Sequence, residues 1–179
     1  MKMRLVPLLV TEIRRPNPTY RVPRSKIALV KEAGSLYATT KPVDFTDDVF
    51  KIAKSLFHQL DREALYVLCL DVKKKIIGIN IVSTGSLTQV VVHPREAYKA
   101  AVLLNARAVI FTHNHPGGGD PKPSEKDEKL TRLLVLAGMV MFIPVLDHII
   151  CTETAYYSFR EAGLIEAYEA TGRRKLRGI

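Results

Sequence analysis

Two histidines near the middle of the chain, His113 and His115, are the side chains best placed to do chemistry. They follow residues 107–112, a short apolar and β-branched run of the length expected for a buried strand. Because alternate residues of a strand share a face, both rings should point the same way, with their Cα atoms about 6.7 Å apart. Pro116 and the glycines after it then predict a sharp turn. This spacing allows both imidazoles to bind one metal ion.

An acidic residue comes back to the histidines from the next element. Ser124 is expected to begin a helix that ends at Gly138, so Asp127 falls in its first turn. Two neutral imidazoles and one carboxylate leave a fourth tetrahedral position for water, which is the layout of a catalytic zinc site. The alternatives are structural: a His-x-His pair arises by chance in some chains, and Ser124 with Asp127 also fits a helix capping pair. Strand, turn and helix in this order favour Zn²⁺.

These motifs resemble those of a known family, the RadC-like branch of the JAMM (MPN-domain) zinc metallopeptidases. The family pattern is His-x-His, about seven residues, then Ser-x-x-Asp. The resemblance extends over residues 45–164. It is carried by HNHP at 113–116, PSEKD at 123–127, VLDHII at 145–150, DRE at 61–63, TGSL at 84–87 and VHPRE at 92–96.

The resemblance implies a set of site residues. Zinc would be bound by His113, His115 and Asp127, with Ser124 supporting the reacting oxygen. One departure is visible, because eight residues, 116–123, separate the second histidine from the serine. The extra residue lies in the triple glycine, the part of the motif best able to absorb it.

A general base is also implied by the resemblance. In JAMM enzymes a glutamate next to the opening strand acts on the zinc-bound water, and Glu63 holds the corresponding place. Glu96 is the competing candidate, although it also fits an ordinary helix start after Pro94. Asp147 and His148 either orient a zinc ligand or form a plain buried polar pair.

The order of elements predicts an α/β protein: a single layered domain with a central mixed β-sheet flanked by helices, as in MPN/JAMM and cytidine-deaminase-like architectures. Helices and strands alternate along the chain. The expected helices are 46–60, 94–105, 124–138 and 158–170, and the expected strands are 64–70, 76–82, 87–92, 107–112, 139–146 and 148–151.

The charge is concentrated at the two ends of the chain. The net charge is +9, yet residues 1–41 hold nine basic and two acidic residues, and residues 171–179 hold four basic and no acidic ones. We therefore predict a basic N-terminal arm (1–41), a metallo-domain (42–170) and a basic C-terminal tail (171–179). Such ends suit phosphate backbones, or they merely aid solubility.

The function predicted from these features is zinc-dependent hydrolysis of an amide or isopeptide carbonyl in a peptide or protein substrate. The alternative is a DNA-repair-associated protein that binds nucleic acid through its basic ends and has a structural or idle metal site. A zinc deaminase is disfavoured because His-x-Glu and Pro-Cys-x-x-Cys do not occur. The sequence leaves the substrate and the oligomeric state open.

A cytoplasmic, unsecreted protein is expected. Cys69 and Cys151 lie in apolar runs, which favours buried thiols over a disulfide and fits a reducing compartment. No apolar run approaches the ~18 to 20 residues that span a bilayer, so no membrane contact is predicted.

Overall fold

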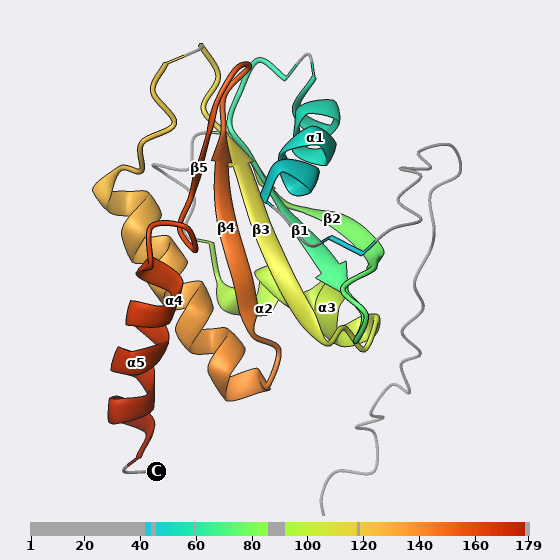
Figure 1. The fold of residues 1–179 in the computed structure, drawn as a ribbon. Helices are drawn as coiled ribbons and strands as arrows, with labels where there is room; N and C mark the ends of the chain where they lie inside the picture. Colours follow the sequence, from blue (N-terminus) through green and yellow to red (C-terminus); the bar gives the residue numbers. More distant parts are fainter. Residues whose placement is uncertain (1–41, 44–45, 59, 86–91, 118, 178–179) are drawn as a thin grey trace, which may run out of the picture. The chain divides into compact units, whose positions relative to one another are not determined.

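A five-stranded mixed sheet is the central element of the computed structural model, which describes residues 42–43, 46–58, 60–85, 92–117 and 119–177 (Figure 1). The strand order is β2-β1-β3-β4-β5. Only β3 and β4 are parallel; the other neighbours are antiparallel. This confirms the predicted α/β class with a mixed sheet. The strands are β1 (Ala64–Leu70), β2 (Ile76–Thr84), β3 (Ala108–Asn114), β4 (Val145–Cys151) and β5 (Tyr156–Ser158).

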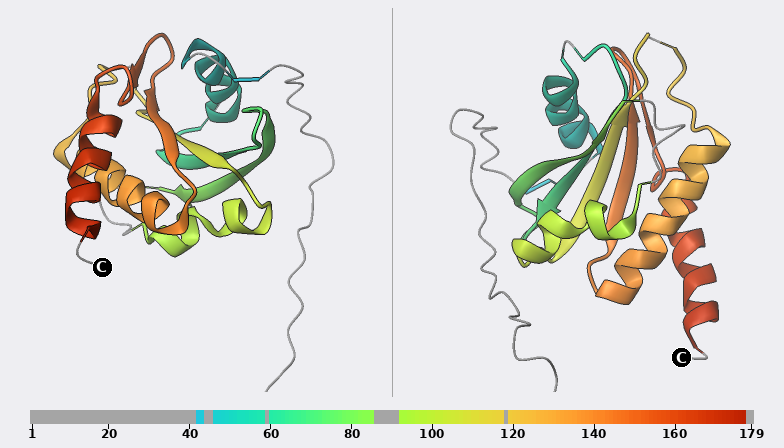
Figure 2. Two further views of the ribbon diagram at one scale, coloured as in Figure 1. Left: turned by 60° about the horizontal axis from the view of Figure 1, so that its bottom comes forward. Right: turned by 180° about the vertical axis from the view of Figure 1, so that it is seen from behind.

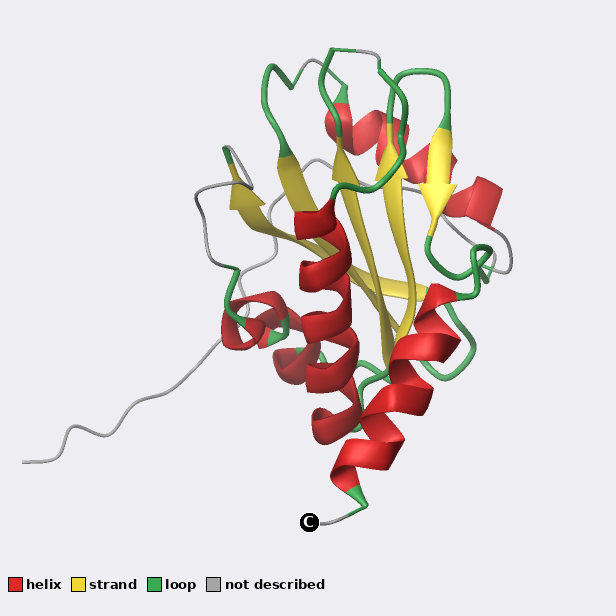
Figure 3. Cartoon of the chain, turned by 90° about the vertical axis from the view of Figure 1, so that its left-hand side faces the viewer, coloured by secondary structure: helices red, strands yellow, loops and turns green. Residues whose placement is uncertain are grey.

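Helices cover both faces of the sheet, which makes three layers (Figure 2). One face packs against α1, and the other packs against the remaining helices. Figure 3 shows α4 and α5 side by side in front of the sheet, with α1 behind it. The helices are α1 (Thr46–Phe57), α2 (Pro94–Ala97), α3 (Lys99–Leu103), α4 (Glu125–Met141) and α5 (Leu164–Leu176).

The inner strands are buried on both faces of the sheet, which explains why their sequences are continuous apolar runs. All seven residues of β1 are buried. Leu65 and Val67 belong to the core under α4, whereas Tyr66 and Leu68 belong to the core under α1. A strand covered on both faces needs apolar side chains at every position rather than at alternate ones.

Strand pairing brings the predicted site residues to one end of the sheet. In the antiparallel pair β1–β3, Leu65 lies opposite His113. Glu63 immediately precedes β1, so it lies at the same end of the sheet as His113. In the parallel pair β3–β4, Asn114 lies opposite Cys151. The backbone N–H of His115 donates to the carbonyl of Cys151 at 2.9 Å, which continues the pairing past the end of β3.

The predicted helix end at Gly138 is wrong. α4 continues to Met141, and Phe142 ends it in the left-handed conformation with φ 57°. Gly138 is needed for close packing: a Cβ there would lie 2.5 Å from the Tyr98 hydroxyl and 2.6 Å from the backbone oxygen of Ile143. The glycine therefore marks a close contact inside the helix and not its end.

Three further boundaries differ from the prediction because of tertiary contacts. The helix expected over 94–105 is divided at Tyr98, whose buried hydroxyl donates to the carbonyl of Leu134 at 2.9 Å. Asp147 does not separate two strands, since it lies inside β4 and accepts a hydrogen bond from Ser158 at 2.6 Å. Ser158 itself ends β5, and the last helix begins at Leu164.

Other expectations agree with the structure or lie outside its description. The helix beginning at Thr46 and the β1–β2 hairpin are confirmed. Cys69 and Cys151 are buried free thiols, and burial raises the pKa of each to about 11. Residues 1–41 and 86–91, which include the arm and most of the strand expected at 87–92, lie outside the described residues. Within the described part, every helix is too short or too polar to cross a membrane.

The two helical glycines Gly138 and Gly172 make a matched test of this packing. A Cβ at Gly172 would meet only flexible side-chain atoms of Met139 and Leu136. We expect Gly138→Ala to lower the free energy of unfolding by about 1–3 kcal/mol, because a backbone oxygen cannot move aside. Gly172→Ala should change it by less than about 1 kcal/mol, since the helix-propensity gain of alanine offsets the adjustment. Denaturant unfolding measures both, and equal losses would contradict this account.

Candidate metal centre

The side chains of His113, His115 and Asp127 converge at the C-terminal end of β3. The Nε2 atom of His113 lies 3.2 Å from Nε2 of His115 and 3.3 Å from Oδ1 of Asp127. Nε2 of His115 lies 3.6 Å from Oδ2 of Asp127. One ligand atom from each residue can be chosen so that all three lie within 4.8 Å of one another, a group that could hold a metal ion.

The three side chains differ in their exposure. The side chain of His113 is fully buried, that of Asp127 is 8% exposed, and that of His115 is 23% exposed. The sheet and α4 therefore enclose two of the three groups, while the third faces outward. Of the three side chains, that of His115 is the most open to a ligand.

Ser124 and Asp127 form a complete helix capping box. The Ser124 hydroxyl and backbone N–H donate to Oδ2 of Asp127 at 2.6 and 2.8 Å, and the Asp127 N–H donates to the Ser124 hydroxyl oxygen at 3.3 Å. Oδ1 of Asp127 remains directed at His113. The capping pair and the cluster with the histidines thus coexist, because the cap accepts at Oδ2 and leaves Oδ1 facing His113. The Ser124 hydrogen points to Asp127, and its support of a reacting oxygen stays a prediction.

The electrostatics favour an ionised Asp127. Burial alone would raise its pKa, but hydrogen bonds with His113, His115 and Ser124 outweigh burial and lower the pKa well below its usual range. The pKa of His115 is raised, first by its hydrogen bond with Asp127 and further by the charges of Asp127 and Glu63. An ionised carboxylate beside two imidazoles is suited to a cation.

Glu63 is held close to this centre by Asn114, the residue between the two histidines. The Asn114 side chain accepts a hydrogen bond from the Ala64 N–H at 2.8 Å and donates one to the Arg62 carbonyl at 3.1 Å. Asn114 therefore holds the backbone on both sides of Glu63 by hydrogen bonds. The charge of Glu63 contributes to the raised pKa of His115. Asn114 was not among the predicted site residues, although its place between the histidines at a strand end was a signal.

Glu96, the competing candidate base, is placed differently. It lies on α2, forms ion pairs with Lys99 and Arg95, and its pKa is lowered mainly by the hydrogen bond with Lys99. In Figure 1, α2 lies toward the opposite end of the sheet from the C-terminal end of β3. The arrangement favours Glu63 over Glu96 as the carboxylate near the centre.

Behind His113 lies a second buried histidine, His148 of β4. Its Nε2 is 2.9 Å from Nδ1 of His113, and its Nδ1 is 2.7 Å from the hydroxyl of Thr131 on α4. Burial lowers the pKa of His148 well below its ordinary value. Asp147, in contrast, accepts hydrogen bonds from Ser158 and from backbone N–H groups, including that of His148. Of this sequence pair, only the His148 ring contacts the centre.

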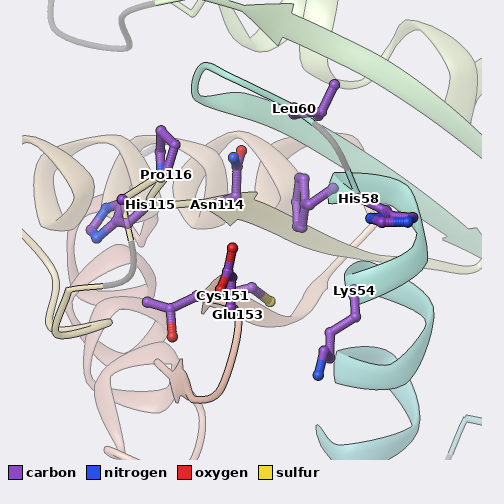
Figure 4. Close-up of a pocket in the computed structure, with 11 residues that line it drawn as sticks. Lys54, His58, Leu60, Asn114, His115, Pro116, Cys151 and Glu153 are labelled. Carbon is purple, nitrogen blue, oxygen red and sulfur yellow. The ribbon is translucent and has the colours of Figure 1, made fainter.

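A pocket of about 430 Å³ adjoins the centre between α1 and the ends of β3 and β4. Figure 4 shows His115 on one side of it, Lys54 of α1 and His58 just after α1 on the other, and Asn114 between them. His58 is exposed and lines this pocket. The open side of the metal centre thus leads into a cavity.

Comparison with known proteins agrees with this architecture. The RadC-like JAB domain pattern matches residues 43–164. UPF0758 protein STH371 of Symbiobacterium thermophilum is 45% identical over 117 residues, 65% of this chain and 50% of that protein. A UPF0758 protein of Chlorobium chlorochromatii is 42% identical over 118 residues, 66% of this chain and 53% of that protein.

A longer match covers more of this chain. A UPF0758 protein of Desulfitobacterium hafniense is 34% identical over 166 residues, 90% of this chain and 73% of that protein. The chain spans about half the length of the first two relatives, and the three names state no activity. The matched span includes the histidines, the capping box and Glu63, and the chain belongs to the RadC-like JAB domain family.

Proposed function

We propose that the protein is a zinc-dependent hydrolase that cleaves an amide or isopeptide bond in a peptide or protein substrate. The observation that carries the proposal is that two imidazole nitrogens and one carboxylate oxygen at the end of β3 lie within 4.8 Å of one another. The family supports a metal-dependent JAB domain, and the pocket beside His115 supports access for a substrate.

The donor atoms suit zinc in type and in spacing. Zn²⁺ takes nitrogen and carboxylate ligands at about 2.0–2.1 Å, so neighbouring ligand atoms in a tetrahedral site lie about 3.4 Å apart. Nε2 of His113 lies 3.2 Å from Nε2 of His115 and 3.3 Å from Oδ1 of Asp127, and both distances are close to this spacing. Three protein ligands leave a fourth position open, as in catalytic zinc sites.

When bound, Zn²⁺ supplies a water of lowered pKa and polarises a substrate carbonyl. Glu63 is assigned the proton transfer: its carboxylate takes a proton from the attacking water and returns it to the leaving nitrogen. Ser124 is assigned to the reacting oxygen. That role requires its hydroxyl hydrogen to turn from Asp127 toward the substrate, because the structure directs it at Oδ2.

The substrate would approach through the pocket between α1 and the ends of β3 and β4. This cavity borders His115, the most exposed of the three site side chains. A scissile carbonyl there would reach the open side of the centre, while the flanking residues of a peptide would lie along α1. The fully buried His113 is shielded from the substrate and serves only the metal.

Metal content tests the first part of the proposal. We expect the parent protein to bind one Zn²⁺ and His113→Ala to lose it, because the variant keeps only one imidazole and one carboxylate. The matched control is His58→Ala, which removes an exposed histidine of the pocket that is not in the cluster. Elemental analysis after dialysis measures all three proteins. Equal zinc content in the parent and His113→Ala would show that zinc is not bound by His113.

The base is tested by exchanging a carboxylate for an amide. Glu63→Gln should keep zinc and lower turnover on a peptide library by roughly 10²–10⁴-fold, the usual contribution of a general base. Glu96→Gln is the matched control and should hydrolyse as the parent does. If Glu63→Gln turns over as fast as the parent, then Glu63 is not the base.

A second candidate function, nucleic-acid binding through the basic ends, is favoured by one observation. The last turn of α5 carries Arg173, Arg174 and Lys175, all exposed, although basic residues there also suit the helix dipole. Arg173 is paired with Glu169, which leaves its neighbours better placed to meet a phosphate backbone.

Salt dependence tests this second function. If the tail binds DNA, affinity should fall with salt, and Arg174→Gln with Lys175→Gln should lower the log–log slope by roughly one for each lost phosphate contact. Lys129→Gln, in an exposed ion pair on α4, is the control that should leave the slope unchanged. Fluorescence anisotropy with a DNA duplex gives the slopes. Unchanged slopes in the double variant would exclude the tail as a binding surface.

A further inference from the structure

A buried hydrogen-bond chain connects two of the three residues of the metal centre. It runs from Nδ1 of His113 to His148 at 2.9 Å, from His148 to the Thr131 hydroxyl at 2.7 Å, and from that hydroxyl to the backbone carbonyl of Asp127 at 2.6 Å. His113, His148 and Thr131 are all fully buried. The chain joins β3, β4 and the first turns of α4 behind the centre, on the side away from the pocket.

The direction of each hydrogen bond in the chain can be assigned. The carbonyl of Asp127 only accepts, so the single hydrogen of the Thr131 hydroxyl goes to it. The hydroxyl oxygen must then accept from Nδ1–H of His148. With its hydrogen on Nδ1, a neutral His148 has a lone pair on Nε2, which accepts from Nδ1–H of His113.

The surroundings of His148 keep its ring neutral and in place. The ring stacks on Phe159 with centroids 5.3 Å apart and an interplanar angle of 14°, and Phe111 meets it edge-on at 6.3 Å. Neither ring nitrogen has an anionic partner, because one faces Thr131 and the other faces His113. A positive charge buried without a counter-ion is costly, so the neutral form is favoured.

We propose that His148, oriented by Thr131, is a positioning residue that keeps the hydrogen of His113 on Nδ1 and so leaves Nε2 to bind the metal. This inference rests on the metal site of the proposed function and not on the hydrolytic reaction. Metal-bound histidines commonly donate their second N–H to a carboxylate, a carbonyl or water. Here the acceptor is another imidazole, whose own tautomer is set by a hydroxyl on the helix that carries Asp127.

The matched variants Thr131→Val and Thr131→Ser test the proposal in the full chain. Valine keeps the shape but removes the hydroxyl, so Nδ1–H of His148 loses its acceptor and the ring is free to hold its hydrogen on Nε2, against His113. Serine keeps the hydroxyl. We expect Thr131→Val to bind Zn²⁺ roughly 10–100-fold more weakly, the usual effect of losing an outer-shell partner, and Thr131→Ser to keep the parental affinity. A competing chelator dye measures the affinities.

Nitrogen-15 NMR of the histidine rings gives a readout that simple loss of packing would not produce. In the parent protein, with and without Zn²⁺, the ring of His148 should carry its hydrogen on Nδ1; His148→Gln identifies its signals. Glutamine also offers a donor and an acceptor, so this variant should retain more zinc affinity than His148→Leu. A hydrogen on Nε2 of parental His148, or equal zinc affinity in Thr131→Val and the parent, would overturn the proposal.

The outcomes separate this inference from the metal site itself. If the parent protein bound no Zn²⁺, the proposed function would fail, while the tautomer of His148 could still be read in the metal-free protein. If the parent bound Zn²⁺ and neither Thr131→Val nor His148→Leu weakened binding, the metal site would stand and the positioning role would be excluded.

Discussion

Burying the imidazole of His113 is the constraint on which the rest of the structure depends. A polar ring inside an apolar sheet is tolerated only when its nitrogens have partners. Nδ1 is satisfied by His148, and Nε2 faces His115 and Asp127. Among the described residues, every buried side-chain nitrogen or oxygen atom has a hydrogen-bond partner. The buried polar atoms at this end of the sheet therefore satisfy one another, and His115 is the most exposed side chain of the cluster.

Strand alternation allows one strand end to organise two different regions. Residues 113 and 114 are neighbours in β3, so their side chains leave the sheet on opposite faces. His113 points under α4, toward the metal centre, whereas Asn114 lines the pocket against α1 and holds the backbone around Glu63. A shift of pairing by one residue would exchange these faces and separate the histidine from Asp127. The parallel partner β4 and the antiparallel partner β1 together fix that register.

Features set by local spacing were predictable from the sequence, and features set by contacts between distant segments were not. The approach of His115 to His113 follows from strand geometry, and the place of Asp127 follows from the helix start at Ser124. Gly138 is required by its close contact with Tyr98, forty residues earlier in the chain. Local sequence does not show this contact, so the glycine was wrongly predicted to end the helix. The contact of Thr131 with His148 likewise joins a helix to the strand that follows it, and no local sequence pattern predicts this contact.

The two oxygens of Asp127 have different partners. Oδ2 accepts the hydrogen bonds of the capping box, and Oδ1 faces His113. Ser124 and Asp127 thus cap the first turn of α4. The hydrogen bond from the Thr131 hydroxyl to the Asp127 carbonyl further stabilises this turn. In many structural zinc sites the binding energy of the metal is folding energy, because the ligands are not held without it. Here hydrogen bonds of the protein itself hold Asp127 beside the two histidines.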